Sequence, residues 1–311
     1  MIANKKAALH AFQYELKQSK LSNMWFINLL INIITLGINS FWAKARMRKY
    51  IISCVQFAGN KFYYTASGWL LCKGFFKGLF VLISISVISS AFATNNIVGL
   101  INIVLMWYLI NVVTYQKFRH IFSMTNWKST YFNIEGSANQ FAFLKIHWTL
   151  VNIVTLGLTV PHTDKILYSY MIENLSFANE KFVVNSINTD NLSKVHLKML
   201  LLFIPTCGMY YFWYKAAFFR ELFSCISYKH LKFKSTHTGL GMLWLFITNL
   251  VIHIGVLGLG SIFTTERKIC YLATHVFILG DIDFLDKIAS DNANNIREEG
   301  LGEFLAYSDG L

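Results

Sequence analysis

An internal repeat constrains the fold of this chain more than any other feature of its sequence. Residues 29–37 read LLINIITLG and residues 149–157 read TLVNIVTLG, which places the two stretches 120 residues apart. The same register aligns Phe57 with Phe177. Self-similarity of this kind indicates that each copy is one supersecondary unit, and that neighbouring copies must stack to bury their apolar faces.

Other offsets add three further copies of the same unit. The aligned pairs include Phe57 and Trp127 at an offset of 70, Trp42 and Trp213 at 171, and Gly37 and Gly258 at 221. The copies lie near residues 27–68, 97–138, 147–190, 197–238 and 248–287. Each reads as an apolar helix, a glycine break, a second helix with basic and aromatic residues, and a short aromatic strand. The sequence therefore predicts one repeat-built membrane domain over residues 24–288, between an amphipathic segment at 1–23 and an acidic tail at 289–311.

The long apolar runs and the scarcity of charge predict that lipid surrounds part of this chain. The 311 residues are 55% hydrophobic and 14% charged, whereas a soluble domain is charged at about a quarter of its residues. Six runs approach or reach the roughly 20 residues that cross about 30 Å of hydrocarbon. They lie near residues 24–42, 78–92, 97–116, 146–160, 197–212 and 239–263. The expected fold is an all-α polytopic membrane protein with about six transmembrane helices, short interfacial helices and small β-strand elements.

The formal net charge of +12 predicts an anionic partner. Nucleic acid is one candidate, but the basic residues flank the apolar runs and form no separate basic domain, which favours anionic lipid headgroups. Tryptophan anchors at the headgroup layer, and long basic side chains reach the phosphates from just below it. The lipid-headgroup candidates are Trp42, Lys44, Arg46, Arg48, Lys49, Lys73, Lys77, Trp213 and Lys215. We expect contact with membrane lipids and no binding of nucleic acid.

Three polar side chains occupy equivalent places inside the apolar runs. Asn32, Asn152 and His253 each stand five residues before a repeated glycine. Polar groups within membrane segments are costly, and this makes them candidates for lining a solute or ion route. The alternative is a structural one, in which they hydrogen-bond between helices at about 0.6 kcal/mol each and so join the copies.

Lys145 and His147 form a second polar pair, at the start of the fourth apolar run. They either complete a buried site with Asp164 or lie as an ordinary pair at the interface, and their spacing does not decide between the two. No HExxH, GxSxG, Walker A or paired-carboxylate signature is present, and the five cysteines lack metal-ligand spacing. The sequence therefore predicts a protein that is not an enzyme and has no cofactor and no metal. The alternative is an intramembrane lipid-modifying enzyme, which would need a cluster of titratable groups facing one pocket.

Several motifs resemble one known family. The stretches TLGINSFWAKARMRKY, FAGNKFYYTASG and LCKGFFKG look like the opening module of the YjgN family of bacterial inner-membrane proteins, and NWKSTYFNIEGS and LKFKSTHTG resemble later parts of its pattern. The third copy departs from the first, with His162, Thr163 and Asp164 in place of a Trp-Ala-Lys run. The resemblance implies a multi-pass protein of the bacterial inner (cytoplasmic) membrane with a domain of unknown function, and it supplies no catalytic residues.

Two functions from different classes are consistent with these features. The first is transport or a pore, because repeats packed about a pseudo-axis enclose a polar route between them. The second is a non-catalytic membrane scaffold or anionic-lipid-binding protein that uses the basic and aromatic helices as an interfacial platform. The sequence does not set the substrate, the direction of transport or the oligomeric state.

Overall fold

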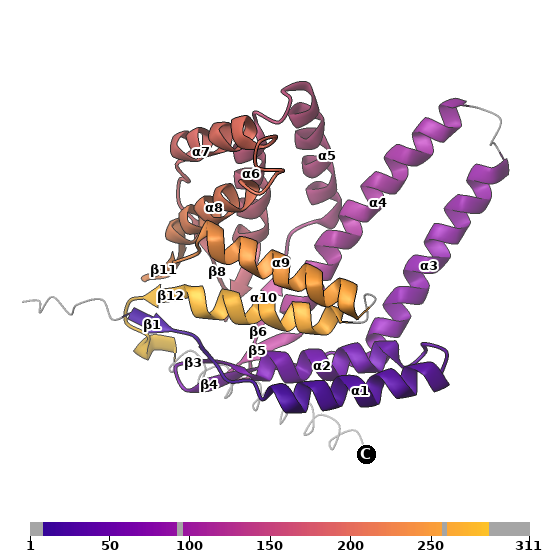
Figure 1. Ribbon diagram of the computed structural model, residues 1–311, viewed down its shortest axis with the longest axis horizontal. Helices are drawn as coiled ribbons and strands as arrows, with labels where there is room; N and C mark the ends of the chain where they lie inside the picture. The colour runs from indigo at the N-terminus through magenta and orange to yellow at the C-terminus, as the bar shows by residue number, and fades with distance from the viewer. Residues whose placement is uncertain (1–8, 92–95, 257–259, 286–311) are drawn as a thin grey trace, which may run out of the picture.

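The computed structural model describes residues 9–91, 96–256 and 260–285 of the chain, and in this part helical hairpins alternate with short strands (Figure 1). The helices pair in chain order into five helical hairpins, α1–α2, α3–α4, α5–α6, α7–α8 and α9–α10. Their bounds are α1 (Gln18–Ile34), α2 (Ser40–Ser53), α3 (Gly68–Ala91), α4 (Asn96–Ser123), α5 (Ala138–Val154), α6 (Val160–Glu173), α7 (Thr189–Leu202), α8 (Tyr211–Cys225), α9 (Gly239–Gly255) and α10 (Ser261–His275).

Local sequence explains where several of these helices begin. Ser137, Asn188 and Thr238 precede α5, α7 and α9, and each accepts a hydrogen bond from a backbone N–H in the first turn of its helix. Such a cap satisfies donors that the first turn otherwise leaves without a partner. The chain therefore enters these hairpins at a polar residue that follows a strand.

The strands form two antiparallel sheets. Their bounds are β1 (Leu9–Ala11), β2 (Gln13–Tyr14), β3 (Val55–Phe57), β4 (Asn60–Tyr64), β5 (Thr125–Trp127), β6 (Thr130–Ile134), β7 (Leu175–Phe177), β8 (Glu180–Lys181), β9 (Val183–Val184), β10 (Ile226–Tyr228), β11 (Leu231–Ser235) and β12 (Val276–Leu279). The order is β1-β12-β11-β10-β9 in one sheet and β2-β3-β4-β5-β6-β7-β8 in the other.

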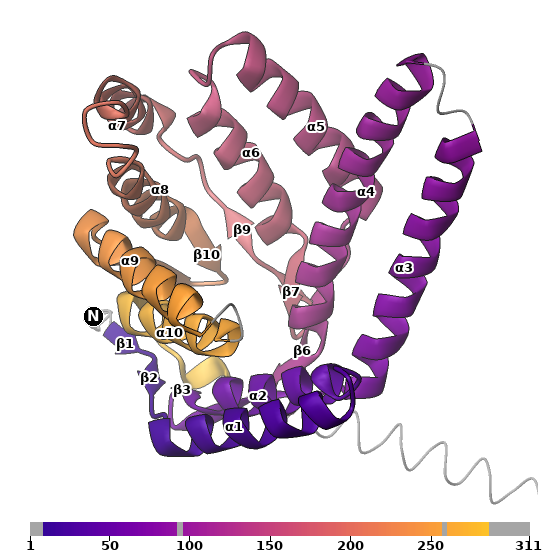
Figure 2. The same cartoon turned by 45° about the vertical axis from the view of Figure 1, so that its right-hand side comes forward.

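The two sheets are joined at both ends, so the strands form a closed ring. β1 and β2 belong to different sheets but only Phe12 separates them, and Phe182 alone separates β8 from β9. β1 pairs with β12 in a register that places Leu9 opposite Leu279, which brings the two ends of the described chain together. Figure 2 shows the helical hairpins spreading outward from these strands.

Aromatic side chains line the interior of the strand ring. The repeat-equivalent residues Phe57, Trp127, Phe177 and Tyr228 are between 2% and 5% exposed. Successive members lie with ring centroids 5.8, 6.1 and 6.1 Å apart. A second layer follows the same order and consists of Phe12, Phe62, Phe132, Phe182 and Phe233. Aromatic pairs contribute about 0.5–1.5 kcal/mol beyond the burial of their surface, so this stack is a major part of the core.

The expectation of an all-α protein with about six transmembrane helices is wrong. The fold is mixed α/β with two antiparallel sheets, and no helix in the described part of the chain combines the length and apolar character needed to cross a membrane. The predicted span at residues 24–42 is divided between α1 and α2, and that at 146–160 between α5 and α6. Each of these apolar runs contains a tight turn, and α1 has 17 residues, whereas about 20 are needed to cross.

Candidate functional site

The turns of the α1–α2, α5–α6 and α7–α8 hairpins share one backbone conformation. In each of them a residue with positive φ is followed by a glycine with positive φ, and the glycine N–H donates to the carbonyl oxygen five residues earlier at 2.7 Å. These pairs are Leu36 and Gly37, Leu156 and Gly157, and Cys207 and Gly208. Glycine tolerates positive φ because it has no Cβ, which explains the glycine of the repeat. Gly258 of the fifth copy lies outside the described residues.

These turns carry the most exposed apolar side chains of the described chain. Leu36 is 93% exposed, Leu156 86% and Ile204 87%, and their neighbours Ile34 and Val154 are 81% and 83% exposed. Large apolar side chains gathered at repeated places on a surface are typical of sites that contact a protein or a membrane. The hairpin turns are therefore a candidate interaction surface.

Most of the predicted lipid-headgroup cations lie on the surface of α2 and the first half of α3. The exposed members are Lys44, Arg46, Lys49, Lys73 and Lys77. Arg46 also donates to the side-chain oxygen of Asn28, and half-buried Arg48 donates to the Tyr64 hydroxyl at 3.3 Å. Exposed Lys44 lies in the first half of α2, near the apolar turn, whereas Lys49 lies toward the other end of the helix. Arg46 joins α2 to α1, and Arg48 joins α2 to β4.

The two predicted tryptophan anchors are packing contacts between neighbouring hairpins. A Cβ built at Gly68 would lie 2.6 Å from the Trp42 ring, and one built at Gly239 would lie 2.6 Å from the Trp213 ring. These glycines begin α3 and α9, so Trp42 of α2 packs against the start of the α3–α4 hairpin and Trp213 of α8 packs against the start of the α9–α10 hairpin. Trp213 remains 38% exposed and its ring stacks on Tyr210.

The three polar residues at equivalent repeat positions are held in three separate hairpins. The side-chain oxygen of Asn152 accepts from the hydroxyls of Thr159 at 2.6 Å and Thr163 at 3.1 Å. His253 Nε2 lies 3.4 Å from the Thr264 hydroxyl, within the α9–α10 hairpin. Asn32 lines a cavity of about 290 Å³ between α1, α2 and α10. Among the described residues, no hydrogen bond joins these three side chains to one another.

Lys145 and His147 do not meet Asp164. Lys145 is half-buried with its Nζ 6.0 Å from the centre of the Phe141 ring, and His147 is exposed beside Trp148. Asp164 instead pairs with Lys215 at 2.8 Å, although the sequence placed Lys215 among the headgroup contacts. One signal for this pair was present, because Asp164 and Lys215 follow Lys44 by 120 and 171 residues, the two repeat offsets.

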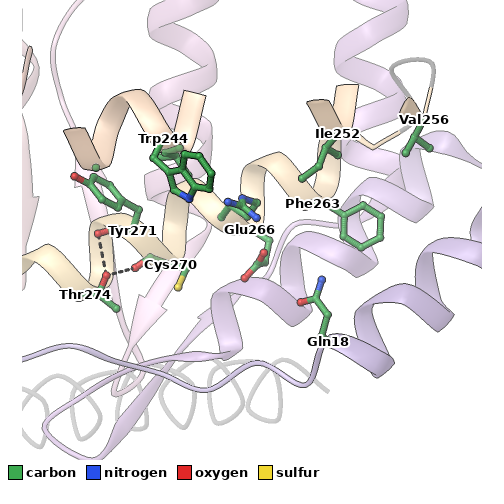
Figure 3. A pocket seen from close by; sticks show the side chains of 12 residues that line it. Gln18, Trp244, Ile252, Val256, Phe263, Glu266, Cys270, Tyr271 and Thr274 are labelled. Carbon is green, nitrogen blue, oxygen red and sulfur yellow. Dashed lines mark hydrogen bonds between the residues drawn. The ribbon is translucent and has the colours of Figure 1, made fainter. Parts of the chain in front are cut away.

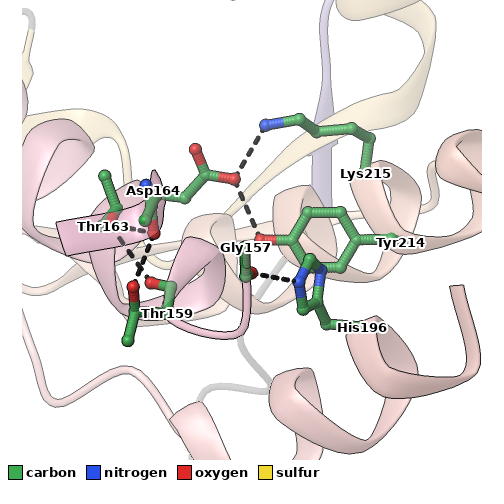
Figure 4. A network of polar contacts seen from close by, with 8 residues as sticks. Gly157, Thr159, Thr163, Asp164, His196, Tyr214 and Lys215 are labelled. Atoms are coloured by element: carbon green, nitrogen blue, oxygen red, sulfur yellow. Dashed lines mark hydrogen bonds and ion pairs between the residues drawn. The ribbon is translucent and has the colours of Figure 1, made fainter. Parts of the chain in front are cut away.

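Asp164 and Lys215 are the centre of a buried polar network that links α5–α6 to α7–α8 (Figure 4). The side chains of both are only 16% exposed, and the hydroxyl of fully buried Tyr214 donates to the same Asp164 oxygen at 2.9 Å. Burial lowers the pKa of Lys215, but the charge and hydrogen bond of Asp164, together with the nearby Tyr211 and Tyr168, raise it above its ordinary value. The network therefore holds a charged pair between two hairpins.

His196 of α7 completes the network and was missed by sequence reasoning. Its Nε2–H donates to the Gly157 carbonyl at 2.8 Å, and its Nδ1 is buried with no hydrogen-bond partner. Burial lowers the pKa of His196, although the bond to Gly157 opposes the shift. Neutral His196 thus fixes the turn of one hairpin against the first helix of the next.

A second polar site lies in a cavity of about 680 Å³ between α9, α10 and the start of α1 (Figure 3). Glu266 on its wall is 7% exposed, and the Tyr14 hydroxyl donates to it at 3.2 Å. Burial raises the pKa of Glu266. The sequence offered no signal for this contact, because 252 residues separate its partners. In the described residues no three His, Cys, Asp or Glu side chains gather as metal ligands.

In the described part of the chain, five helical hairpins surround a closed ring of strands and three of them have exposed apolar turns, which defines a repeat-built α/β protein. A family model described as "Bacterial protein of unknown function (DUF898)" matches residues 9–210 and 186–306. The chain therefore belongs to the DUF898 family of bacterial proteins. No curated protein and no solved structure matches it.

Proposed function

We propose that this protein attaches to a lipid bilayer by inserting the apolar turns of its helical hairpins, and that its exposed lysines bind anionic headgroups. The observation that carries the proposal is the exposure of 86% to 93% at Leu36, Leu156 and Ile204. Complete burial of one such side chain contributes about 1.5–3 kcal/mol, so three inserted turns contribute about 5–9 kcal/mol. The attachment needs no spanning helix, because it uses only the ends of short hairpins.

Basic side chains support the choice of an anionic surface. Lys44 and Lys49 lie on α2, the helix that follows the Leu36 turn, and both are exposed. A lysine near an anionic bilayer contributes about 1 kcal/mol. The resemblance of residues 35–78 to inner-membrane proteins of the YjgN family agrees with this location, and we propose the bacterial inner membrane as the bilayer and YjgN as the group within DUF898.

The structure offers no specific observation in favour of transport. A polar route past Asn32, Asn152 and His253 stays a prediction, since Asn152 and His253 bond inside their own hairpins and no hydrogen bond among the described residues connects the three. The interior of the strand ring is aromatic. We therefore propose lipid binding as the function and treat the protein as non-catalytic.

Vesicle sedimentation tests the proposal. Changing Leu36, Leu156 and Ile204 together to Asp should lower binding to vesicles of phosphatidylglycerol and phosphatidylcholine at least 100-fold, and the three single variants should show which turns insert. Val183→Asp is the matched control, because Val183 is a 53% exposed apolar residue on the strand ring. Undiminished binding of the triple variant would refute the insertion of the turns.

A second arm of the same assay tests the headgroup contact. Lys44→Gln should weaken binding about fivefold on the anionic vesicles, from about 1 kcal/mol of lost attraction, whereas Lys49→Gln, farther from the turn, should weaken it less. Binding to vesicles of phosphatidylcholine alone should not change. Equal losses on both kinds of vesicle would show that the lysines act on folding and not on the headgroups.

A further inference from the structure

An apolar cavity of about 370 Å³ lies where the strand ring meets the inner ends of the helices. The wall on the strand side is aromatic and includes Phe57, Trp127 and Phe177, while Ile52 of α2 and Ile269 of α10 contribute from the helices. Strands from all five repeated units contribute side chains, so the cavity is a product of the whole ring and not of one hairpin.

Every polar side chain on the wall is already hydrogen-bonded to the protein. Trp127 donates its ring N–H to the Phe57 carbonyl at 3.3 Å, and the Tyr228 hydroxyl donates to the Phe177 carbonyl at 2.8 Å. The Thr125 hydroxyl donates to a backbone carbonyl of α4 at 2.7 Å. Water needs two to four polar partners to occupy a cavity, whereas an apolar cavity stays dry and takes apolar ligands. The wall therefore suits a hydrocarbon.

The size and the access of the cavity narrow the class of ligand. A cavity of about 150 Å³ accommodates benzene, and this one is more than twice as large. On the strand side Tyr228 is 2% and Leu231 1% exposed, whereas Leu272 of α10 is 47% exposed and is the most open residue of the wall. A long, narrow apolar group can therefore enter from the side of the helices and leave a polar end outside.

We propose that this cavity is a binding site for one fatty acyl chain, supplied by a free fatty acid or by a phospholipid. The chain lies among the aromatic side chains of the ring, and its headgroup remains at the mouth beside Leu272. This site is separate from the hairpin turns, which are on the surface and leave the ring interior untouched.

Filling the cavity from two sides provides the test. Ile52→Phe and Ile269→Phe each add volume inside the cavity, and Ile247→Phe is the control, because Ile247 is 38% exposed on α9 and is not on the wall. The probe is cis-parinaric acid, which fluoresces in apolar sites. Each filled variant should bind the probe at least tenfold more weakly while melting at a higher temperature without ligand, because the added ring occupies a void.

A filled cavity lowers the affinity for the probe and raises the melting temperature. Damage to the fold would lower both the affinity and the melting temperature. Laurate should displace the probe from the wild type and raise its melting temperature, whereas butyrate should do neither. The absence of saturable binding to the wild type, or tight binding to both folded filled variants, would overturn the proposal. If a filled variant does not fold, the laurate measurements on the wild type decide the question.

Two further measurements identify the source of the chain and separate this site from the attachment. Acyl chains extracted from the purified protein with equimolar phosphate would identify a phospholipid, and acyl chains without phosphate a free fatty acid. The filled variants should sediment with vesicles as the wild type does, while the triple turn variant should still bind cis-parinaric acid. Vesicle sedimentation therefore tests the attachment and probe binding tests the cavity, and each result stands without the other.

Discussion

Removing the ammonium group of Lys215 should destabilise the fold far more than removing a similar one from the surface. In the wild type, Lys215 Nζ lies 2.8 Å from Asp164 Oδ2, and each side chain is 16% exposed. Lys215→Met leaves the carboxylate buried with the hydroxyl of Tyr214 as its remaining side-chain partner. Breaking a buried pair costs about 3–5 kcal/mol. We expect about 3 kcal/mol, because water still reaches a small part of both groups.

The chain contains a matched control for this change. Lys181 and Glu135 also form an ion pair at 2.8 Å, but their side chains are 55% and 52% exposed. Lys181→Met should therefore cost under about 1 kcal/mol, as exposed ion pairs do. The distance is the same in the two pairs, so the difference between the two variants isolates the effect of burial.

Replacing both partners should restore most of the loss. Asp164→Leu with Lys215→Met removes the two charges together, and an apolar pair in place of a buried ion pair is often neutral or stabilising. We expect the double variant within about 1 kcal/mol of the wild type, measured as the free energy of unfolding in urea at pH 7. The reasoning fails if Lys215→Met costs no more than Lys181→Met, or if the two single losses simply add.

Two further predictions concern pH and glycine packing. Burial, with smaller contributions from nearby charges, lowers the pKa of His237 from 6.5 to about 4. Because this pKa is lower in the folded protein than in the unfolded chain, neutral His237 contributes to the free energy of unfolding above pH 6.5, and this contribution is lost as the pH falls to 4. The loss amounts to about 3 kcal/mol, and unfolding at pH 7 and pH 4 should show a smaller difference for His237→Gln than for the wild type. Gly239→Ala should cost about 1–3 kcal/mol, because its Cβ would lie 2.6 Å from the Trp213 ring, whereas Gly78→Ala, with no atom within 4 Å of its Cβ, should stabilise α3 by about 0.5–1 kcal/mol. Equal thermal shifts at the two glycines would contradict the packing argument.

The positions of the hairpin turns could be read from the sequence, but the division of each apolar run into two short helices could not. The glycines after LLINIITL and TLVNIVTL marked the positions where the backbone takes positive φ, at Gly37 and Gly157. The residue before each glycine is a leucine, and it also has positive φ. Leucine has the same hydrophobicity in a turn and in a helix. A hydrophobicity pattern therefore predicts one membrane span where the structure has two short helices. The exposure of Leu36 became visible only in the structure.

The contacts between hairpins were harder to predict, because each depends on how neighbouring units face one another. Trp42 stands beside basic residues in the sequence, but its packing against Gly68 depends on the angle between two hairpins. Asp164 and Lys215 stand at the same repeat position with opposite charges, and their contact indicates that this position faces the neighbouring unit. Lys44 and Thr265, also at this position, line one cavity between the first and last hairpins. An alignment of the repeats therefore carries more information on contacts than the pattern of any one unit.

The N-terminal segment has its own place in the repeat. Phe12 and Tyr14 precede Phe62 and Tyr64 by 50 residues, which is the spacing of the later copies. In the first unit β3 pairs with β4, and in the fifth unit β12 stands at the place of β3. β12 pairs with β1 in antiparallel register, so the N-terminal segment supplies the strand that corresponds to β4. Because β2 continues from β1 and pairs with β3, the same segment also closes the ring. An unpaired edge strand is a template for aggregation, and this segment removes that edge with a contact that joins the two ends of the described chain.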